Sequence, residues 1–222
     1  MQLIIFDCDG TLVDSQHAIC AAMAHAFSAL TLPVPTRDRV LDIVGLSLPQ
    51  VFAVLAGDQP DSVQAKLVEL YRAGGPGPHA GAARDPLFAG VAELIAALAC
   101  RDDVVLGIAT GKSRRGVARI LEREAWSGHF LTIQTADDHP SKPHPAMIVQ
   151  AMAEVGADAS TTIMVGDTSY DMEMAVNAGV RGIGVGWGYH APARLLQAGA
   201  RLIIDEAADL MAVIDQPVRA IA

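Results

Sequence analysis

Residues 3–14 read LIIFDCDGTLVD, and this stretch decides the fold class. It opens with four apolar residues and then changes abruptly to polar residues and glycine at Asp7, Asp9 and Gly10. A short apolar run that ends in this way is typical of a buried strand in a parallel sheet. The polar residues after such a strand lie at its carboxyl end, where open α/β sheets bind their ligands. The segment therefore predicts a central strand and the edge of the sheet that carries the chemistry.

Runs of the same kind recur along the chain, with helical patterns between most of them. We expect further buried strands at residues 104–109, 130–135, 162–165, 182–185 and 202–204. Helical spacing is clear where Ile148, Met152 and Val155 form one apolar stripe, which Pro145 opens and Gly156 closes. Strands that alternate with helices predict an α/β protein with a Rossmann-like, three-layer parallel sheet.

Residues 15–85 break this alternation, because they contain helical patterns and no convincing strand. Ile19, Met23 and Phe27 share one apolar face of a predicted helix. The glycine- and proline-rich stretch 74–86 is typical of a flexible linker. We therefore predict an all-helical cap domain at residues 15–85, inserted into a core made of residues 1–14 and 86–222.

Bulk composition restricts the class of partner and the compartment. Hydrophobic residues make up 51% of the 222 residues and charged residues 18%, which favours a packed globule. The formal net charge of −9 disfavours binding to nucleic acid or to an anionic membrane. No apolar run has the length of a membrane-spanning helix, and no signal peptide is visible. The three cysteines form no CxxC pair, which is typical of a reduced compartment. We expect a cytoplasmic protein that is a monomer or a homodimer.

Carboxylates follow two of the predicted strands. Asp7 and Asp9 come after the first strand, and Asp167 and Asp171 come after the strand at 162–165. Because parallel strands end at the same edge of a sheet, these four side chains would repel one another strongly without cations. A divalent metal together with Lys142 is the simplest source of that positive charge, and Mg²⁺ suits a set of oxygen ligands.

Four segments resemble the ordered motifs of the haloacid dehalogenase superfamily. They are DCDGTLVDS at 7–15, TGKS at 110–113, SKPHP at 141–145 and GDTSYDM at 166–172, each at a predicted strand end or helix start. The resemblance extends over essentially the whole chain. The helical insertion after the first motif is similar to the small cap of the subclass that includes phosphoglycolate phosphatase and β-phosphoglucomutase.

The resemblance implies a phosphatase and assigns a role to each motif residue. Asp7 would attack phosphorus and form an aspartyl-phosphate. Asp9 would protonate the leaving oxygen and then accept a proton from water. The Thr110 hydroxyl and the Gly111 N–H would bind phosphate oxygens, and Lys142 would neutralise charge on the phosphoryl group.

The same resemblance implies a Mg²⁺ site. Its ligands would be the Asp7 side chain, the Asp9 backbone carbonyl and Asp167. Asp171 would orient Lys142 or a metal-bound water. A calcium-binding loop that starts at Asp7 is disfavoured, because its twelfth position would need Glu and is Ala18.

The cap is expected to choose the substrate, since it closes over the leaving group. Arg39, Leu46 and Arg72 are candidate substrate-binding residues, with the arginines as carboxylate partners. A small phosphorylated metabolite, such as a phosphoglycolate-like phosphomonoester, fits the family resemblance.

Two other functions stay open at this point. A phosphomutase of the β-phosphoglucomutase type would need basic residues around the cap turn at 44–48, which is apolar here. A non-catalytic phosphate-binding regulatory module would lack at least one of Asp7, Asp9 and Lys142, and all three are present. Phosphoryl hydrolysis is therefore the favoured interpretation.

Overall fold

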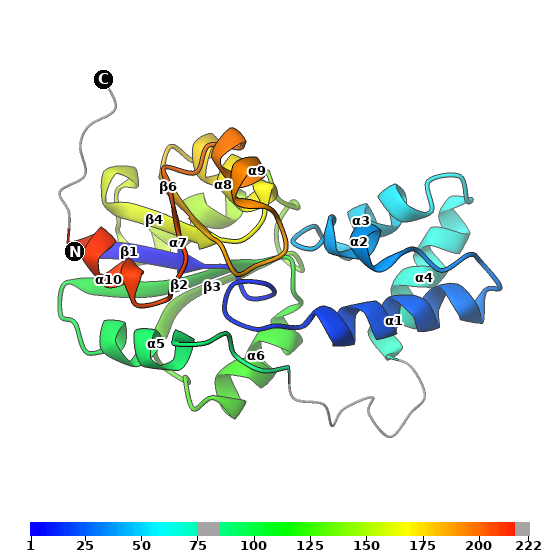
Figure 1. Cartoon of the computed structure of the whole chain (residues 1–222), viewed down its shortest axis with the longest axis horizontal. Helices are drawn as coiled ribbons and strands as arrows, with labels where there is room; N and C mark the ends of the chain where they lie inside the picture. The colour runs from blue at the N-terminus through cyan, green and yellow to red at the C-terminus, as the bar shows by residue number, and fades with distance from the viewer. Residues whose placement is uncertain (75–84, 216–222) are drawn as a thin grey trace.

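The computed structural model describes residues 1–74 and 85–215, and its core is a six-stranded sheet (Figure 1). Neighbouring strands are all parallel, in the order β3-β2-β1-β4-β5-β6. The strands are β1 (Gln2–Phe6), β2 (Val104–Thr110), β3 (Phe130–Thr135), β4 (Thr162–Gly166), β5 (Arg181–Val185) and β6 (Leu202–Ile204). The predicted α/β fold class is confirmed.

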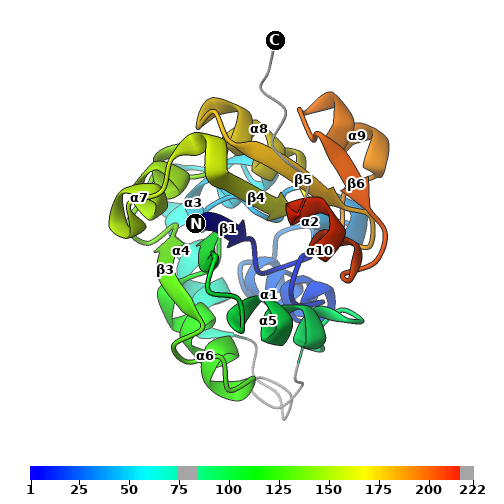
Figure 2. The ribbon, with the colours of Figure 1, turned by 90° about the vertical axis from the view of Figure 1, so that its left-hand side faces the viewer.

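Helices cover both faces of the sheet, as Figure 2 shows. Side chains alternate along β1, so Ile4 and Phe6 enter one hydrophobic core while Leu3 and Ile5 enter another. The first core contains side chains of α5 (Val91–Ala99), α6 (Arg114–Arg123) and α10 (Asp209–Ile214), and the second contains side chains of α7 (Ala146–Val155) and α8 (Ser169–Asn177). A short helix, α9 (Pro192–Gln197), packs beside α8. The result is the three-layer arrangement that the alternating pattern predicts.

Four helices between β1 and α5 form a separate unit, the cap, which lies at one end of the molecule in Figure 1. They are α1 (Gln16–Ala29), α2 (Arg37–Leu41), α3 (Leu48–Leu55) and α4 (Asp61–Ala73). The cap has its own core, which includes Met23, Phe27, Phe52 and Leu67. Most of the predicted linker at 74–86 lies outside the described residues, so the domain boundary there stays a prediction.

The chain leaves the core and returns to it at adjacent points. Asp14 N–H donates to the Pro86 carbonyl at 2.8 Å, and Phe88 N–H donates to the Leu12 carbonyl at 3.2 Å. Val13 and Leu87 form an antiparallel bridge between these two hydrogen bonds. The two crossings between core and cap therefore share one narrow, hydrogen-bonded base.

The helices are short, and the longest that the structure describes is α1, with 14 residues. Among residues 1–74 and 85–215, no helix combines the length and apolar character needed to cross a membrane.

Candidate active site

Three adjacent strands bring polar side chains to one edge of the sheet. Thr110 ends β2, Asp7 directly follows β1, and Asp167 directly follows β4. All three side chains are buried. Because the strands are parallel, residues far apart in the sequence meet at their carboxyl ends. The structure thus collects three of the predicted site residues at one place.

Lys142 is fully buried and reaches this edge from the segment before α7. Its Nζ donates a hydrogen bond to Asp171 Oδ1 at 2.6 Å and lies 3.0 Å from Asp7 Oδ2. Burial lowers the pKa of Lys142, but the charges of Asp171 and Asp7 outweigh burial and raise it. Lys142 is therefore a fixed positive charge beside Asp7.

Asp171 is held by the first turn of α8. Thr168 caps this helix, and its N–H and Oγ1 both donate to Asp171 Oδ2, at 3.0 and 2.7 Å. Asp171 N–H donates in return to Thr168 Oγ1 at 3.3 Å. One carboxylate oxygen is thereby occupied by the helix cap, and the other is directed at Lys142. This geometry matches the first of the two roles expected for Asp171, that of orienting the lysine.

Asp7, Asp167 and Asp171 each contribute an oxygen to a cluster in which these atoms lie within 4.8 Å of one another. Asp7 Oδ2 is buried and accepts no hydrogen bond within the described part of the chain, although Lys142 Nζ lies 3.0 Å from it. Burial raises the pKa of Asp7 to about 6 although Lys142 acts in the opposite direction, and burial also raises the pKa of Asp167. Crowded carboxylates with an unsatisfied oxygen fit a divalent cation, and hard oxygen donors fit Mg²⁺.

Asp167 is fixed tightly by its neighbours. Its Oδ1 accepts a hydrogen bond from Thr11 Oγ1 and its Oδ2 accepts one from Tyr189 N–H, both at 2.9 Å. Two glycines lie against it: a Cβ on Gly10 would come within 2.1 Å of Asp167 Oδ2, and one on Gly188 within 2.1 Å of Asp167 Cβ. Gly10 also has a φ of +89°, which disfavours any other residue. Both backbone segments therefore need glycine to pass this close to the carboxylate.

Asp9 is partly exposed and is held by two donors. Its Oδ1 accepts hydrogen bonds from Ser15 Oγ at 2.5 Å and from Lys112 Nζ at 2.7 Å. Lys112 folds back toward Asp9 over Gly116, where a Cβ would lie 2.9 Å from Lys112 Cγ. The sequence did not predict roles for Ser15 and Lys112, and the only signal was that both lie within motif segments.

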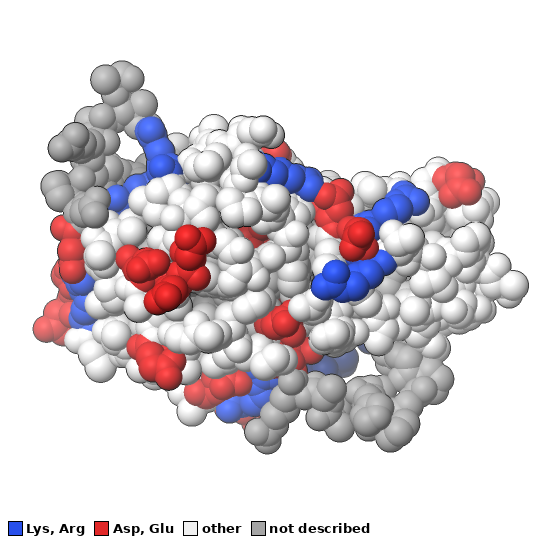
Figure 3. Space-filling model, viewed as in Figure 1, with Lys and Arg blue, Asp and Glu red and all other residues white. Residues whose placement is uncertain are grey.

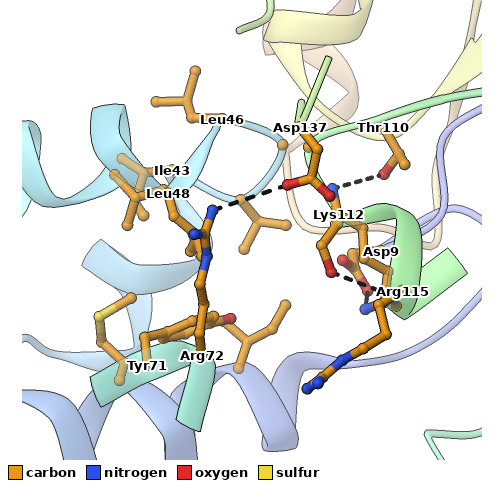
Figure 4. Close-up of a pocket in the computed structure, with 18 of the residues that line it drawn as sticks. Asp9, Ile43, Leu46, Leu48, Tyr71, Arg72, Thr110, Lys112, Arg115 and Asp137 are labelled. Atoms are coloured by element: carbon orange, nitrogen blue, oxygen red, sulfur yellow. Dashed lines mark hydrogen bonds and ion pairs between the residues drawn. The ribbon is translucent and has the colours of Figure 1, made fainter. Parts of the chain in front are cut away.

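Core and cap together enclose a cavity of about 750 Å³ that Asp7, Asp9, Thr110 and Gly111 line. Figure 4 shows Asp9, Thr110 and Lys112 of the core on one side of this cavity and the labelled cap residues on the other. Both Leu46 and Arg72, which were predicted to bind substrate, line it from the cap.

Arg39 does not reach this cavity. Its side chain lines a second cavity of about 540 Å³ that is formed within the cap, together with residues such as Phe27 and Val54. The neighbouring Val40 and Leu41 are the buried residues of the short helix α2, so Arg39 is on its exposed side. Arg39 is therefore not at the cavity beside Asp7, and its contact with the substrate stays a prediction.

The turn between α2 and α3 packs against the motif segments of the core. Ser47 N–H donates to Ser141 Oγ at 2.8 Å, directly beside Lys142. Gly111 meets the same turn, where a Cβ would lie 2.5 Å from the Gly45 carbonyl oxygen. The cap is thus in close contact with two of the segments that build the site.

A second set of contacts holds the start of this turn. The Asp42 carbonyl accepts a hydrogen bond from Tyr170 Oη at 3.3 Å and lies 3.2 Å from His190 Nε2, while the Asp42 carboxylate pairs with Arg194. His190 Nδ1 accepts the Ser169 N–H at 2.9 Å, so the ring proton is on Nε2 and is donated to Asp42. These contacts join the cap to α8 and α9.

Comparison with known proteins identifies the family to which this architecture belongs. Residues 4–185 match the model of the haloacid dehalogenase-like hydrolases, so the chain belongs to this family. It is 37% identical over 206 residues to a probable phosphatase, IndB, of Dickeya dadantii, an alignment that covers 91% of this chain and 89% of that protein. It is 29% identical over 217 residues to a phosphoglycolate phosphatase of Agrobacterium fabrum, and this alignment covers 94% of this chain and 90% of that protein.

A solved structure supports the same assignment. A hydrolase from Pseudomonas syringae aligns with a TM-score of 0.84 and 25% identity, over 97% of this chain and 98% of that chain. The predicted family and fold are confirmed, while the roles of individual residues stay predictions.

Proposed function

We propose that this hydrolase is a Mg²⁺-dependent phosphatase that acts on a small phosphorylated metabolite, a phosphoglycolate-like phosphomonoester, through an aspartyl-phosphate on Asp7. The observation that carries the proposal is the environment of Asp7. Its buried Oδ2 accepts no hydrogen bond from the described residues, lies 3.0 Å from Lys142 Nζ, and belongs to a residue that lines the cavity between core and cap. The named phosphatases among the relatives agree with this chemistry.

Each step of the proposed reaction uses a residue of this chain. A carboxylate oxygen of Asp7 attacks phosphorus, the bond from phosphorus to the leaving oxygen breaks, and Asp9 donates a proton to that oxygen. Asp9 then removes a proton from a water molecule, which attacks phosphorus and releases phosphate and the free Asp7 carboxylate. Asp7, Asp167 and the Asp9 main-chain carbonyl would hold Mg²⁺, which when bound supplies positive charge beside the phosphoryl group.

Thr110 is suited to bind a phosphoryl oxygen. Its Oγ1 accepts a hydrogen bond from Lys112 N–H at 3.2 Å, and a hydroxyl that accepts one hydrogen bond can still donate its own proton. Lys142 would hold a second phosphoryl oxygen, since its charge is fixed and faces Asp7. Both groups stabilise negative charge that spreads over the phosphoryl oxygens in the transition state.

The cap turn gives no support to the phosphomutase alternative. The cap turn contributes Ile43, Val44, Leu46 and Leu48 to the lining, which are all apolar. A mutase must hold a second phosphate while the first is transferred, and an apolar turn offers no charge for that purpose. Water is therefore the proposed acceptor.

The direct test is hydrolysis of a panel of phosphorylated metabolites with Mg²⁺, with excess chelator, and with Ca²⁺ in place of Mg²⁺. We expect turnover with Mg²⁺ only, because Ca²⁺ prefers more ligands at longer distances and disturbs the in-line geometry. Full activity in excess chelator would contradict the metal site. Binding of inorganic phosphate without hydrolysis of any ester would favour the non-catalytic module.

A further inference from the structure

One face of α6 carries a row of positive charges along the cavity. Lys112, Arg115 and Arg119 all line it, and their spacing of three and four residues places them on the same side of the helix and of the turn before it. Gly116 lies on this side too, so no side chain separates the cations from the cavity there. We call Lys112, Arg115 and Arg119 the α6 cationic face.

Arg115 and Arg119 have no carboxylate partner among the residues that the structure describes, whereas the other charged groups of the cavity are paired. The pairs are Asp7 with Lys142, Asp9 with Lys112, Glu69 with Lys66, and Asp137 with Arg72. The remaining arginines of α6 are paired as well, Arg114 with Asp138 and Arg123 with Glu124. Both arginines are exposed, so their guanidinium groups are accessible to a ligand in the cavity.

Much of the opposite wall of the cavity is apolar, because Ile19, Met23, Ile43, Leu48 and Val51 line it from the cap. The charged residues of the cap that line it, Glu69 and Arg72, are both paired. Figure 4 shows Arg115 beside Lys112 and Asp9, across the cavity from Leu48 and Tyr71. The volume of about 750 Å³ is within the range that holds drug-sized ligands, and is more than a very small acid fills.

We propose that the leaving group of the substrate carries a second anionic group, a carboxylate or a phosphate, which Arg115 and Arg119 bind. We further propose that an apolar part of the leaving group lies against the cap. Arginine suits this role because its planar guanidinium donates paired hydrogen bonds to either anion. The inference rests on the proposed phosphatase function and narrows its substrate to phosphomonoesters with an apolar body and a distal anion.

The test compares three esters with the same ring: phenyl phosphate, 4-carboxyphenyl phosphate and 1,4-phenylene bisphosphate. The kcat/KM of each is measured with Mg²⁺ for the wild type, for R115Q/R119Q and for R114Q. We expect the wild type to prefer one or both of the esters with a distal anion. In R115Q/R119Q that preference should fall by roughly 10-fold or more, because the hydrogen bonds from the two guanidinium groups to the distal anion are lost. The ester for which the preference of the enzyme falls shows whether the two arginines bind a carboxylate or a phosphate.

Arg114 is the matched control, because it is the neighbouring arginine on α6 and pairs with Asp138 outside the cavity. R114Q should keep the wild-type preference. The proposal is overturned if the wild type has no preference, or if R115Q/R119Q keeps it. Equal loss on all three esters, with an unchanged circular dichroism spectrum, would also overturn it, because the arginines would then serve the transferred phosphoryl group. If the wild type hydrolyses a metabolite of the panel but none of these three esters, the proposal is overturned. If it hydrolyses neither, the phosphatase function on which the proposal rests is refuted.

Discussion

Asp7 differs from the other buried carboxylates in what surrounds its oxygens. Asp7 Oδ1 accepts the N–H of Cys8 at 2.7 Å, while Oδ2 accepts no hydrogen bond. Both oxygens of Asp167 accept hydrogen bonds, and both oxygens of Asp171 do so as well. Among these three carboxylates, only Asp7 keeps an oxygen that accepts no hydrogen bond from the described residues, which agrees with its proposed role as the nucleophile.

The first prediction concerns this residue. Asp7→Asn should reduce kcat by roughly 10³-fold or more, which corresponds to about 4 kcal/mol of barrier, because the amide is a poor nucleophile. The change keeps the size of the side chain, so a melting temperature near that of the wild type is the control for folding. Activity within tenfold of the wild type would show that Asp7 is not the nucleophile.

Residues at strand ends could be predicted from the sequence, because an apolar run fixes where a parallel strand stops. Asp7, Thr110 and Asp167 were found in this way. The direction of side chains on helices could not be predicted with the same certainty. Neither the cavity that Arg39 lines nor the approach of Lys112 to Asp9 could be predicted, since both depend on how segments distant in the sequence pack.

At the scale of elements, the turn between α2 and α3 is the part of the cap that meets the site. One contact, from Ser47 N–H to Ser141 Oγ, is buried and lies beside Lys142. Another, from Tyr170 Oη to the Asp42 carbonyl, is at the surface. The first hydrogen bond therefore joins cap and core in the interior of the protein, and the second joins them at its surface.

Ser141→Ala should raise KM and lower kcat/KM by roughly 3- to 10-fold, because the Ser47 N–H loses its acceptor and the closed cap is less favoured. The concentration of Mg²⁺ that gives half-maximal activity should not change, since no metal ligand is altered. Tyr170→Phe is the matched variant, and we expect a smaller effect because water can replace an exposed hydroxyl. A larger effect of Tyr170→Phe than of Ser141→Ala would contradict this ranking.

The elements themselves could be predicted closely. The strand expected at 104–109 is observed as Val104–Thr110, and the one expected at 182–185 as Arg181–Val185. Such buried strands are hydrophobic on both faces and end in polar residues or glycine, so their bounds are visible in the sequence. The contacts between cap and core are not visible there, because they join residues such as Ser47 and Ser141 that share no local pattern.

On the scale of the whole molecule, cap and core are two units with separate hydrophobic cores. They are joined at the base where Asp14 and Phe88 make their hydrogen bonds, and they meet again around the cavity. We expect the cap to admit substrate when it is open and to exclude bulk water when it is closed. Closure over the Asp7 site is thus a natural part of the proposed reaction.

The distribution of charge agrees with an anionic substrate that enters an acidic protein. Figure 3 shows acidic side chains on several parts of the face in view, over both the core and the cap. The cavity is different, since its lining among the described residues holds as many basic side chains, Arg72, Lys112, Arg115 and Arg119, as acidic ones, Asp7, Asp9, Glu69 and Asp137. The cavity is therefore less acidic than the chain as a whole, while the net charge of −9 opposes binding of large polyanions.

The central claim is that the phosphoryl group is transferred first to Asp7 and then to water. Its most direct test is the stereochemical course at phosphorus. Phenyl phosphorothioate, made chiral with two oxygen isotopes, is hydrolysed in water that carries the third, and the configuration of the thiophosphate is determined. Two in-line displacements each invert the configuration, so net retention is expected. Net inversion would mean that water attacks the substrate directly, and would contradict a covalent intermediate on Asp7.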